Sequence, residues 1–244
     1  MIKIIYEDDY LLVLDKPPGL VVDRSQTQGN NTLEDWLKLD LKRSGIVHRL
    51  DKDTSGIILV AKTPQALDYL QGQFKLRQVK KQYLALVHGF VTDAGRVEGN
   101  IGRNPQKREK FSVTLDGKQA VTEYEPLERL QFTGDRLQEI FPDFNKIQMR
   151  KLSTIHYNLF TLVACRPLTG RTHQIRVHLK YKGFPIVADK TYVGRKMYRL
   201  DSRWCPRQFL HAAKLEFKHP GSGQWMQFES KLPEDLEEAM NKLT

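Results

Sequence analysis

The sequence HRLDKDTSGIILVA, residues 48–61, joins a short polar loop to an apolar run. The length and β-branched content of Ile57 to Ala61 predict a buried strand. Asp51 lies in the loop before it, close to the cation Arg49. A loop side chain held by a rigid core element is well placed for chemistry. Taken alone, however, an Asp before Thr-Ser-Gly is more often a turn or capping residue that binds its own backbone.

Segments on both sides of this strand have the patterns of other short strands and helices. Residues 2–22 are expected to form a strand, a turn at KPPG (16–19) and a second strand. Thr32 and the Thr63-Pro64 pair are expected to begin two helices, because Thr is a good N-cap and Pro suits the first helical position.

The second half of the chain continues the alternation. We expect strands at 83–87 and 159–165, a helix that Thr172 caps and Gly183 ends, and a C-terminal helix over 233–243. Residues 131–150 are expected to form an extended hairpin or a surface insertion. The whole chain, 1–244, is then a single α+β domain: a mixed, mostly antiparallel central sheet with flanking helices and loops.

Composition limits the function classes. The chain has 244 residues and a net charge of +10, which favours a polyanionic partner, although charge alone fits equally well a basic protein without one. No apolar run approaches the roughly 20 residues of a membrane span, and the N-terminus lacks a signal peptide's pattern, so we expect a cytoplasmic protein with no membrane partner. Cys165 and Cys205 have no nearby metal-ligand partners, and the histidine spacing matches no metal box, so no metal site is expected.

Three further motifs accompany the Asp51 loop. KPPG at 16–19 precedes it, and KQYLALVHG at 81–89 and GRTHQIRVHL at 170–179 follow it in that order. Each has an ordinary explanation alone, since strand tyrosines mostly pack and helical arginines mostly form surface ion pairs. Together the motifs resemble the RluA-like family of RNA pseudouridine synthases, over almost the whole chain from near residue 4 to about residue 230.

The resemblance implies a pseudouridine synthase catalytic domain whose active site lies in a central cleft and uses no cofactor. It implies that Asp51 is the catalytic aspartate, that Tyr83 stacks on the target base and takes part in proton transfer, and that Arg176 pairs with Asp51. Arg49 would help to displace the target nucleotide. An arginine suits this pairing because its charge persists and offsets the rise in pKa that burial imposes on a carboxylate.

The same interpretation predicts how RNA is held. Basic residues cluster at 75–81, 103–110 and 190–203, which is typical of a surface that follows phosphates, although each cluster alone is equally consistent with a solvated face. Side chains expected to contact RNA are His48, Arg49, Arg103, Lys107, Arg108, Arg171, His173 and Gln174. The KPPG motif begins within twenty residues of Met1, so we expect no S4-type module and RNA selection by the catalytic domain itself.

The sequence therefore predicts a monomeric isomerase of structured ribosomal or transfer RNA, without a DNA partner. A catalytically inactive RNA-binding or chaperone module of the same fold is the first alternative. A glycoside- or nucleoside-cleaving enzyme is the second, and it would need another carboxylate, for which Asp53 is the nearest candidate.

Overall fold

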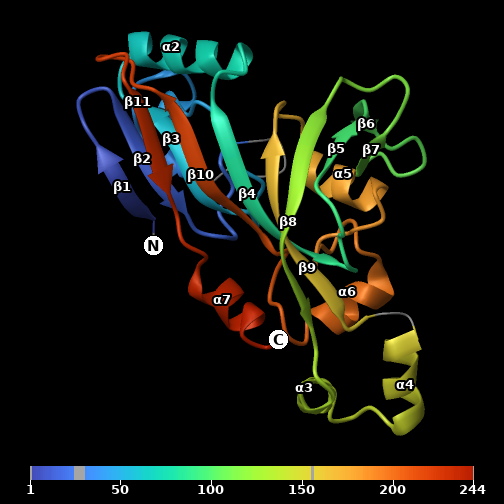
Figure 1. The fold of residues 1–244 in the computed structure, drawn as a ribbon. Coiled ribbons are helices and arrows are strands. Elements are labelled where there is room, and N and C mark those ends of the chain that lie inside the picture. Colours follow the sequence, from blue (N-terminus) through green and yellow to red (C-terminus); the bar gives the residue numbers. More distant parts are fainter. Residues whose placement is uncertain (1, 25–30, 155–156, 244) are drawn as a thin grey trace. The chain divides into compact units, whose positions relative to one another are not determined.

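The structure, a computed structural model, describes residues 2–24, 31–154 and 157–243 (Figure 1). The chain forms two compact units. The first consists of Met1–Tyr83 and His211–Lys231, and the second of Leu84–Leu210 and Leu232–Thr244. Each unit therefore contains two separate stretches of the chain, and each is described by itself below.

The first unit is built on strands that pair in the order β1-β2-β3-β10, with β11 paired to β10. β2 is antiparallel to β1 and β3, whereas β3 runs parallel to β10 over a short stretch, so the sheet is mixed. Its helices are α1, the short 3-10 helix η1, and α2. The elements are β1 (Lys3–Glu7), β2 (Leu11–Lys16), α1 (Leu33–Leu37), η1 (Lys42–Gly45), β3 (Ser55–Ala61), α2 (Pro64–Lys75), β10 (Leu210–Lys218) and β11 (Trp225–Glu229).

The expected buried strand is confirmed, because every residue of β3 is buried. Both helix starts are also confirmed: the side chains of Thr32 and Thr63 each accept a backbone N–H of their helix, and Pro64 is the first residue of α2. These predictions hold because capping and a continuous apolar run are local properties of the sequence.

The expected second strand at residues 20–22 is wrong. The chain reverses earlier, between β1 and β2, where the Asp8 carboxylate accepts the backbone N–H groups of Tyr10 and Leu11. After the KPPG turn only an isolated bridge between Val21 and Thr32 forms. A turn stabilised by an Asp side chain lacks the Gly or Pro that signals most turns, and this is why the pattern misplaced the reversal.

The second unit pairs its strands in the order β4-β9-β8-β5, and a separate two-stranded hairpin pairs β6 with β7 (Figure 1). β4 begins in the first unit and continues into this one. The elements are β4 (Lys80–His88), β5 (Gly95–Glu98), β6 (Ile101–Arg103), β7 (Phe111–Val113), β8 (Val121–Gln131), α3 (Gly134–Ile140), α4 (Lys146–Thr154), β9 (Leu159–Pro167), α5 (Gln174–Tyr181), α6 (Arg195–Asp201) and α7 (Glu234–Met240).

Two local predictions in this unit need correction. Residues 131–150 do not form an extended hairpin, because they hold α3 and the start of α4, and the alternative of a surface insertion stays a prediction. Thr172 does not cap α5, whose N-cap is His173 in the left-handed region at φ 56°. Gly183, at φ +87°, does follow the end of that helix as expected. The mixed sheet of the first unit, the antiparallel pairs of the second and the flanking helices together confirm the α+β class.

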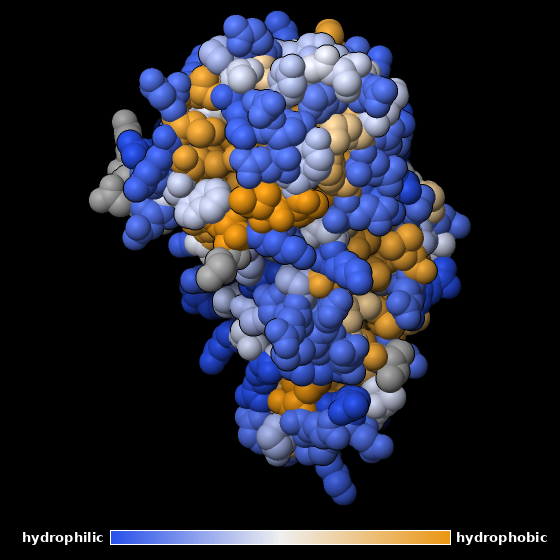
Figure 2. All heavy atoms as spheres, turned by 90° about the vertical axis from the view of Figure 1, so that its left-hand side faces the viewer, coloured by the Kyte–Doolittle hydropathy of each residue, from blue (hydrophilic) through white to orange (hydrophobic). Residues whose placement is uncertain are grey.

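Polar side chains cover most of the face shown in Figure 2, and apolar areas are interspersed among them. Within the described residues, no helix is both long and apolar enough to cross a membrane.

Candidate active site

Asp51 is held at the entrance to β3 by a tight loop. Its carbonyl oxygen accepts the backbone N–H of Thr54 at 3.1 Å, and Leu50 and Thr54 on either side are buried while Asp51 itself is half-buried. Gly56 then brings β3 against β10, since a Cβ at this position would lie 2.3 Å from the Ala212 carbonyl oxygen. The loop motif therefore ends in a glycine because the two strand backbones approach too closely for any side chain.

Lys16 fixes the same loop from the other side. Its side chain is fully buried, and its ammonium group donates to the carbonyl oxygens of Pro17 (2.8 Å), Leu20 (2.9 Å) and Lys52 (3.0 Å). The KPPG turn is thereby tied to the residue after Asp51. A buried lysine is rare unless its charge is compensated, and these three carbonyl groups make Lys16 a structural support of the Asp51 loop that sequence reasoning did not assign. Its signal was the lysine at the end of an apolar strand in the KPPG motif.

His48 links the start of the Asp51 loop to β3. Its Nε2 accepts the backbone N–H of Leu59 at 3.1 Å, and its ring stacks on Phe74 with centroids 4.8 Å apart. Burial, aided by the positive charges of Lys81 and Arg43, lowers the pKa of His48 to about 3 from its ordinary 6.5. The imidazole is therefore neutral at physiological pH and accepts a hydrogen bond that protonation would break.

Replacing His48 by Gln should flatten the acid dependence of stability. The folded-state pKa lies below the unfolded value, so between pH 6.5 and 3 the unfolded chain binds more protons and stability falls as the pH falls. Because of this group, we expect the free energy of unfolding of the wild type to fall by about 1–3 kcal/mol from pH 7 to 4.5, as measured by urea unfolding. The variant keeps all the carboxylates and should lose less. Parallel pH profiles for the two proteins would contradict the assignment.

Tyr83 lies on β4, half-buried against the apolar cluster that includes Leu50, Ile58 and Ala212. Burial, and secondarily the negative charge of Asp51, raise the pKa of its hydroxyl. The phenol therefore remains protonated throughout the physiological range. A neutral ring next to a carboxylate can stack on a base and hold a transferable proton.

Arg49 is 60% exposed, and its Nη1 lies 3.3 Å from Oδ2 of Asp23, which Arg43 also binds at 2.7 Å. A long exposed side chain with one weak ion pair can move at little cost. This freedom agrees with the predicted part of Arg49 in displacing a nucleotide.

Arg176, in the second unit, is buried on α5 and forms a two-pronged ion pair with Asp189. Its Nε lies 2.7 Å from Oδ2 and its Nη2 lies 2.9 Å from Oδ1. Asp189 is itself fully buried, and its Oδ1 also accepts the backbone N–H groups of Thr191 and Tyr192. This fork geometry fixes both the position and the plane of the guanidinium group. The predicted pair of Arg176 with Asp51 joins residues of different units and stays a prediction.

A second buried carboxylate orients the segment that carries Asp189. Asp201 accepts the backbone N–H of Ala188 at 2.8 Å and the hydroxyl of Tyr157 at 3.0 Å, and it pairs with His88 at 3.0 Å. Ala188 has φ 54°, a left-handed conformation that costs energy in a residue with a Cβ. The contacts of Asp201 hold this strained turn in place, and neither Asp189 nor Asp201 was singled out from the sequence.

The remaining predicted RNA contacts divide into exposed and internal side chains. Arg103, Lys107 and Arg108 are exposed on the β6–β7 hairpin, and Arg171 is exposed before α5. Gln174, by contrast, is buried: its amide oxygen accepts from Thr169 and from the Arg171 backbone, and its nitrogen donates to Val121 and Thr122 on β8. We therefore treat Gln174 as the residue that fastens α5 to β8.

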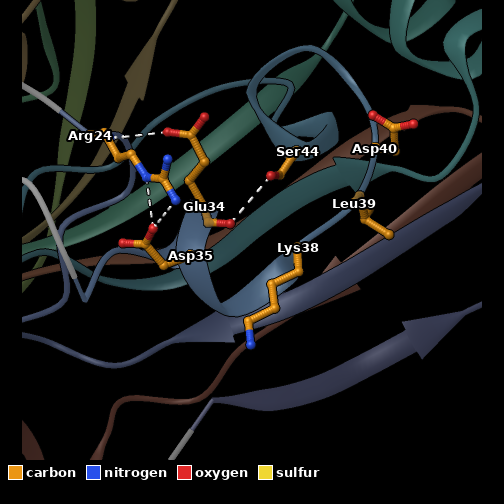
Figure 3. A pocket seen from close by; sticks show the side chains of 7 residues that line it. All are labelled: Arg24, Glu34, Asp35, Lys38, Leu39, Asp40 and Ser44. Carbon is orange, nitrogen blue, oxygen red and sulfur yellow. Dashed lines mark hydrogen bonds and ion pairs between the residues drawn. The ribbon is translucent and has the colours of Figure 1, made fainter.

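A cavity of about 410 Å³ lies beside α1 in the first unit (Figure 3). Two of its charged side chains pair with each other, since Arg24 binds the Asp35 carboxylate, and the backbone N–H of Arg24 donates to Glu34. None of the predicted catalytic residues lines it: the lining is Arg24, Glu34, Asp35, Lys38, Leu39, Asp40 and Ser44. Across the described ranges, no group of three or more His, Cys, Asp or Glu side chains is arranged to hold a metal ion.

Known proteins of one family are similar to this chain in sequence and in fold. A model of the family described as RNA pseudouridylate synthase matches residues 10–181. The chain is 39% identical to the uncharacterized RNA pseudouridine synthase YlyB of Bacillus subtilis (strain 168), over 99% of this chain and 73% of that protein. It is 38% identical to ribosomal large subunit pseudouridine synthase D of Pseudomonas aeruginosa, over 96% of this chain and 69% of that one.

A solved structure is similar as well. Human RNA pseudouridylate synthase domain containing 1 matches with a TM-score of 0.70 and 27% identity, covering 96% of this chain and 84% of that one. The chain belongs to the RNA pseudouridine synthase family, of the RluA-like type. It is accordingly an isomerase that acts on uridine in RNA.

Proposed function

We propose that this enzyme isomerises specific uridines of ribosomal or transfer RNA, with Asp51 as the nucleophile. Relatives named for the large ribosomal subunit make ribosomal RNA the first substrate to test. The observation that supports the assignment of Asp51 is its place in a tight loop at the start of the buried strand β3, in the same unit as Tyr83. The compartment is the cytoplasm, and the active species is a monomer that has no DNA partner.

The chemistry explains each residue type. The reaction breaks the C–N glycosidic bond of a uridine and forms a C–C bond to the same base, so it needs no electron carrier. A carboxylate is ionised at neutral pH and is a suitable nucleophile at a sugar carbon. Arg176, which Asp189 holds in a fixed orientation, would be the cation that pairs with the nucleophile. An arginine suits this part because its charge persists at any physiological pH.

The target nucleotide must leave its stack before any side chain can reach the glycosidic bond. Flipping costs a few kcal/mol, and the cost is smallest in loops and bulges. Tyr83 would recover part of this by stacking on the flipped base, and Arg49 would fill the vacated place. The exposed cations Arg103, Lys107 and Arg108 would bind the flanking phosphates.

Pseudouridine mapping tests the proposal directly. Ribosomal and transfer RNA transcribed in vitro would be incubated with the purified protein, treated with carbodiimide, and read by primer extension. Stops at a small set of uridines are expected, and their sequence context identifies the substrate. Tight RNA binding without stops on either class would instead favour the inactive RNA-binding module.

A further inference from the structure

Tyr192 is a buried residue of the second unit that joins several predicted functional groups. It lies in the turn before α6, and no catalytic or binding part was assigned to it from the sequence. Its ring lies over the guanidinium carbon of Arg176, 5.0 Å from the ring centroid. Its backbone N–H donates to Oδ1 of Asp189, the carboxylate that grips Arg176. One residue thus contacts both members of the buried ion pair.

The hydroxyl of Tyr192 faces the β6–β7 hairpin instead. It accepts the backbone N–H of Phe111 at 3.1 Å and forms a 2.8 Å hydrogen bond with Nδ1 of His173. The rings of Phe111 and His173 also meet edge to face, with centroids 5.6 Å apart. These three side chains therefore form one contiguous cluster between the hairpin and the start of α5.

Lys110 also ties the hairpin to the same turn, because it donates to the carbonyl oxygen of Thr191 at 2.5 Å. The apolar side chains of the two strands, Ile101, Phe111 and Val113, pack in a cluster with Val177 of α5 and Tyr192. The loop between the strands is mostly exposed, and Arg103 lies over the ring of Phe111 at 4.7 Å. A two-stranded hairpin is marginally stable by itself, so its orientation depends on what it is fastened to.

His173 is held in an unusual conformation at this junction. It occupies the N-cap of α5 at φ 56°, yet its side chain makes no capping hydrogen bond. The imidazole bonds to Tyr192 in place of the helix end. Strain of this kind persists only where surrounding contacts fix it, and it is concentrated at functional sites.

We propose that Tyr192 is a positioning residue that sets Arg176 and the RNA-contacting hairpin in register with each other. Its ring holds the plane of the Arg176 guanidinium, and its hydroxyl fixes the hairpin that carries Arg103, Lys107 and Arg108. The proposal rests on the proposed function, in which Arg176 pairs with the nucleophile and the hairpin binds RNA. It predicts that loss of the hydroxyl changes mainly the KM for RNA and that loss of the ring changes kcat.

Two substitutions separate the contribution of the Tyr192 ring from that of its hydroxyl. Tyr192→Phe keeps the ring over Arg176 and removes the hydroxyl, so the KM for RNA should rise about 3- to 10-fold with kcat changed less than about twofold. Tyr192→Leu removes the ring as well, so kcat should fall by roughly a further 10-fold. A kcat for the Leu variant equal to that of the Phe variant would overturn the proposed hold on Arg176.

Limited proteolysis tests the hairpin without RNA. Trypsin should cut after Lys107 and Arg108 about 3- to 10-fold faster in Tyr192→Phe than in the wild type, because the loop loses its fastening. Thr161→Val is the matched control, since it also removes a buried hydroxyl in the same unit, but one that bonds to the backbone of Gly89 and Val91. It should not accelerate these cuts.

Equal cleavage rates in the Tyr192→Phe and Thr161→Val proteins would overturn the proposal. Failure of the proposed function is a different result: the wild type would then modify no RNA, while the proteolysis difference would remain.

Discussion

Replacing Asp51 by Asn should abolish pseudouridine formation while leaving RNA binding intact. Asn has nearly the same shape, so the half-buried loop with its Thr54 contact should persist. It has no ionised oxygen to attack the sugar or the base, and loss of a nucleophile typically costs at least ~10⁴-fold in rate. Single-turnover assays on the mapped RNA measure the rate, and filter binding at fixed salt measures the affinity, which should not fall because a negative charge has been removed.

Asp53→Asn is the matched control. It makes the same change two residues away at an exposed position, and its rate should stay within about twofold of the wild type. A loss of comparable size in the Asp53 variant would contradict the single-nucleophile proposal and would favour chemistry with two carboxylates. Full activity of Asp51→Asn would exclude Asp51 as the nucleophile.

The second large effect is expected at Asp189. Replacing it by Asn leaves the buried Arg176 guanidinium without its charged partner, and breaking a buried pair in this way typically costs about 3–5 kcal/mol. Urea unfolding measures the loss of stability. Activity should fall by ~10² or more even at temperatures where the variant is folded, because Arg176 is no longer held in its plane.

A double variant separates these two consequences. Arg176→Gln combined with Asp189→Asn replaces the ion pair with two neutral amides, and the Asn oxygen can still accept the backbone N–H groups of Thr191 and Tyr192. The double variant should therefore regain most of the lost free energy of unfolding yet stay inactive. Recovery of activity together with stability would mean that Arg176 and Asp189 serve the fold alone.

The local parts of the fold followed from the sequence. A continuous apolar run predicted β3, and Thr32, Thr63 and Gly183 marked helix ends correctly, because these signals act within a few residues. The same reasoning failed at Thr172, where the residue next to it became the N-cap. There His173 forms a tertiary hydrogen bond with Tyr192, and no local sequence pattern contains such a contact.

The candidate site, like the fold, was predicted only in part from the sequence. Ordered motifs singled out Asp51, Tyr83 and Arg176 as candidates, and the family that these motifs resemble is the one whose model matches residues 10–181. The same motif led to an RNA-binding interpretation of Gln174, which its internal hydrogen bonds do not favour. A buried amide and a substrate-facing amide look identical in a sequence, since only packing determines what surrounds them.

The sequence by itself determined the class of enzyme, the elements around Asp51 and the basic character of the chain. Only the tertiary structure decided what holds the functional groups in place. Lys16 reaches the Lys52 carbonyl across 36 positions, and Tyr192 reaches Phe111 across 81. Such contacts depend on how distant segments pack, and a hydrogen bond or a ring contact at that separation leaves no periodic trace along the chain.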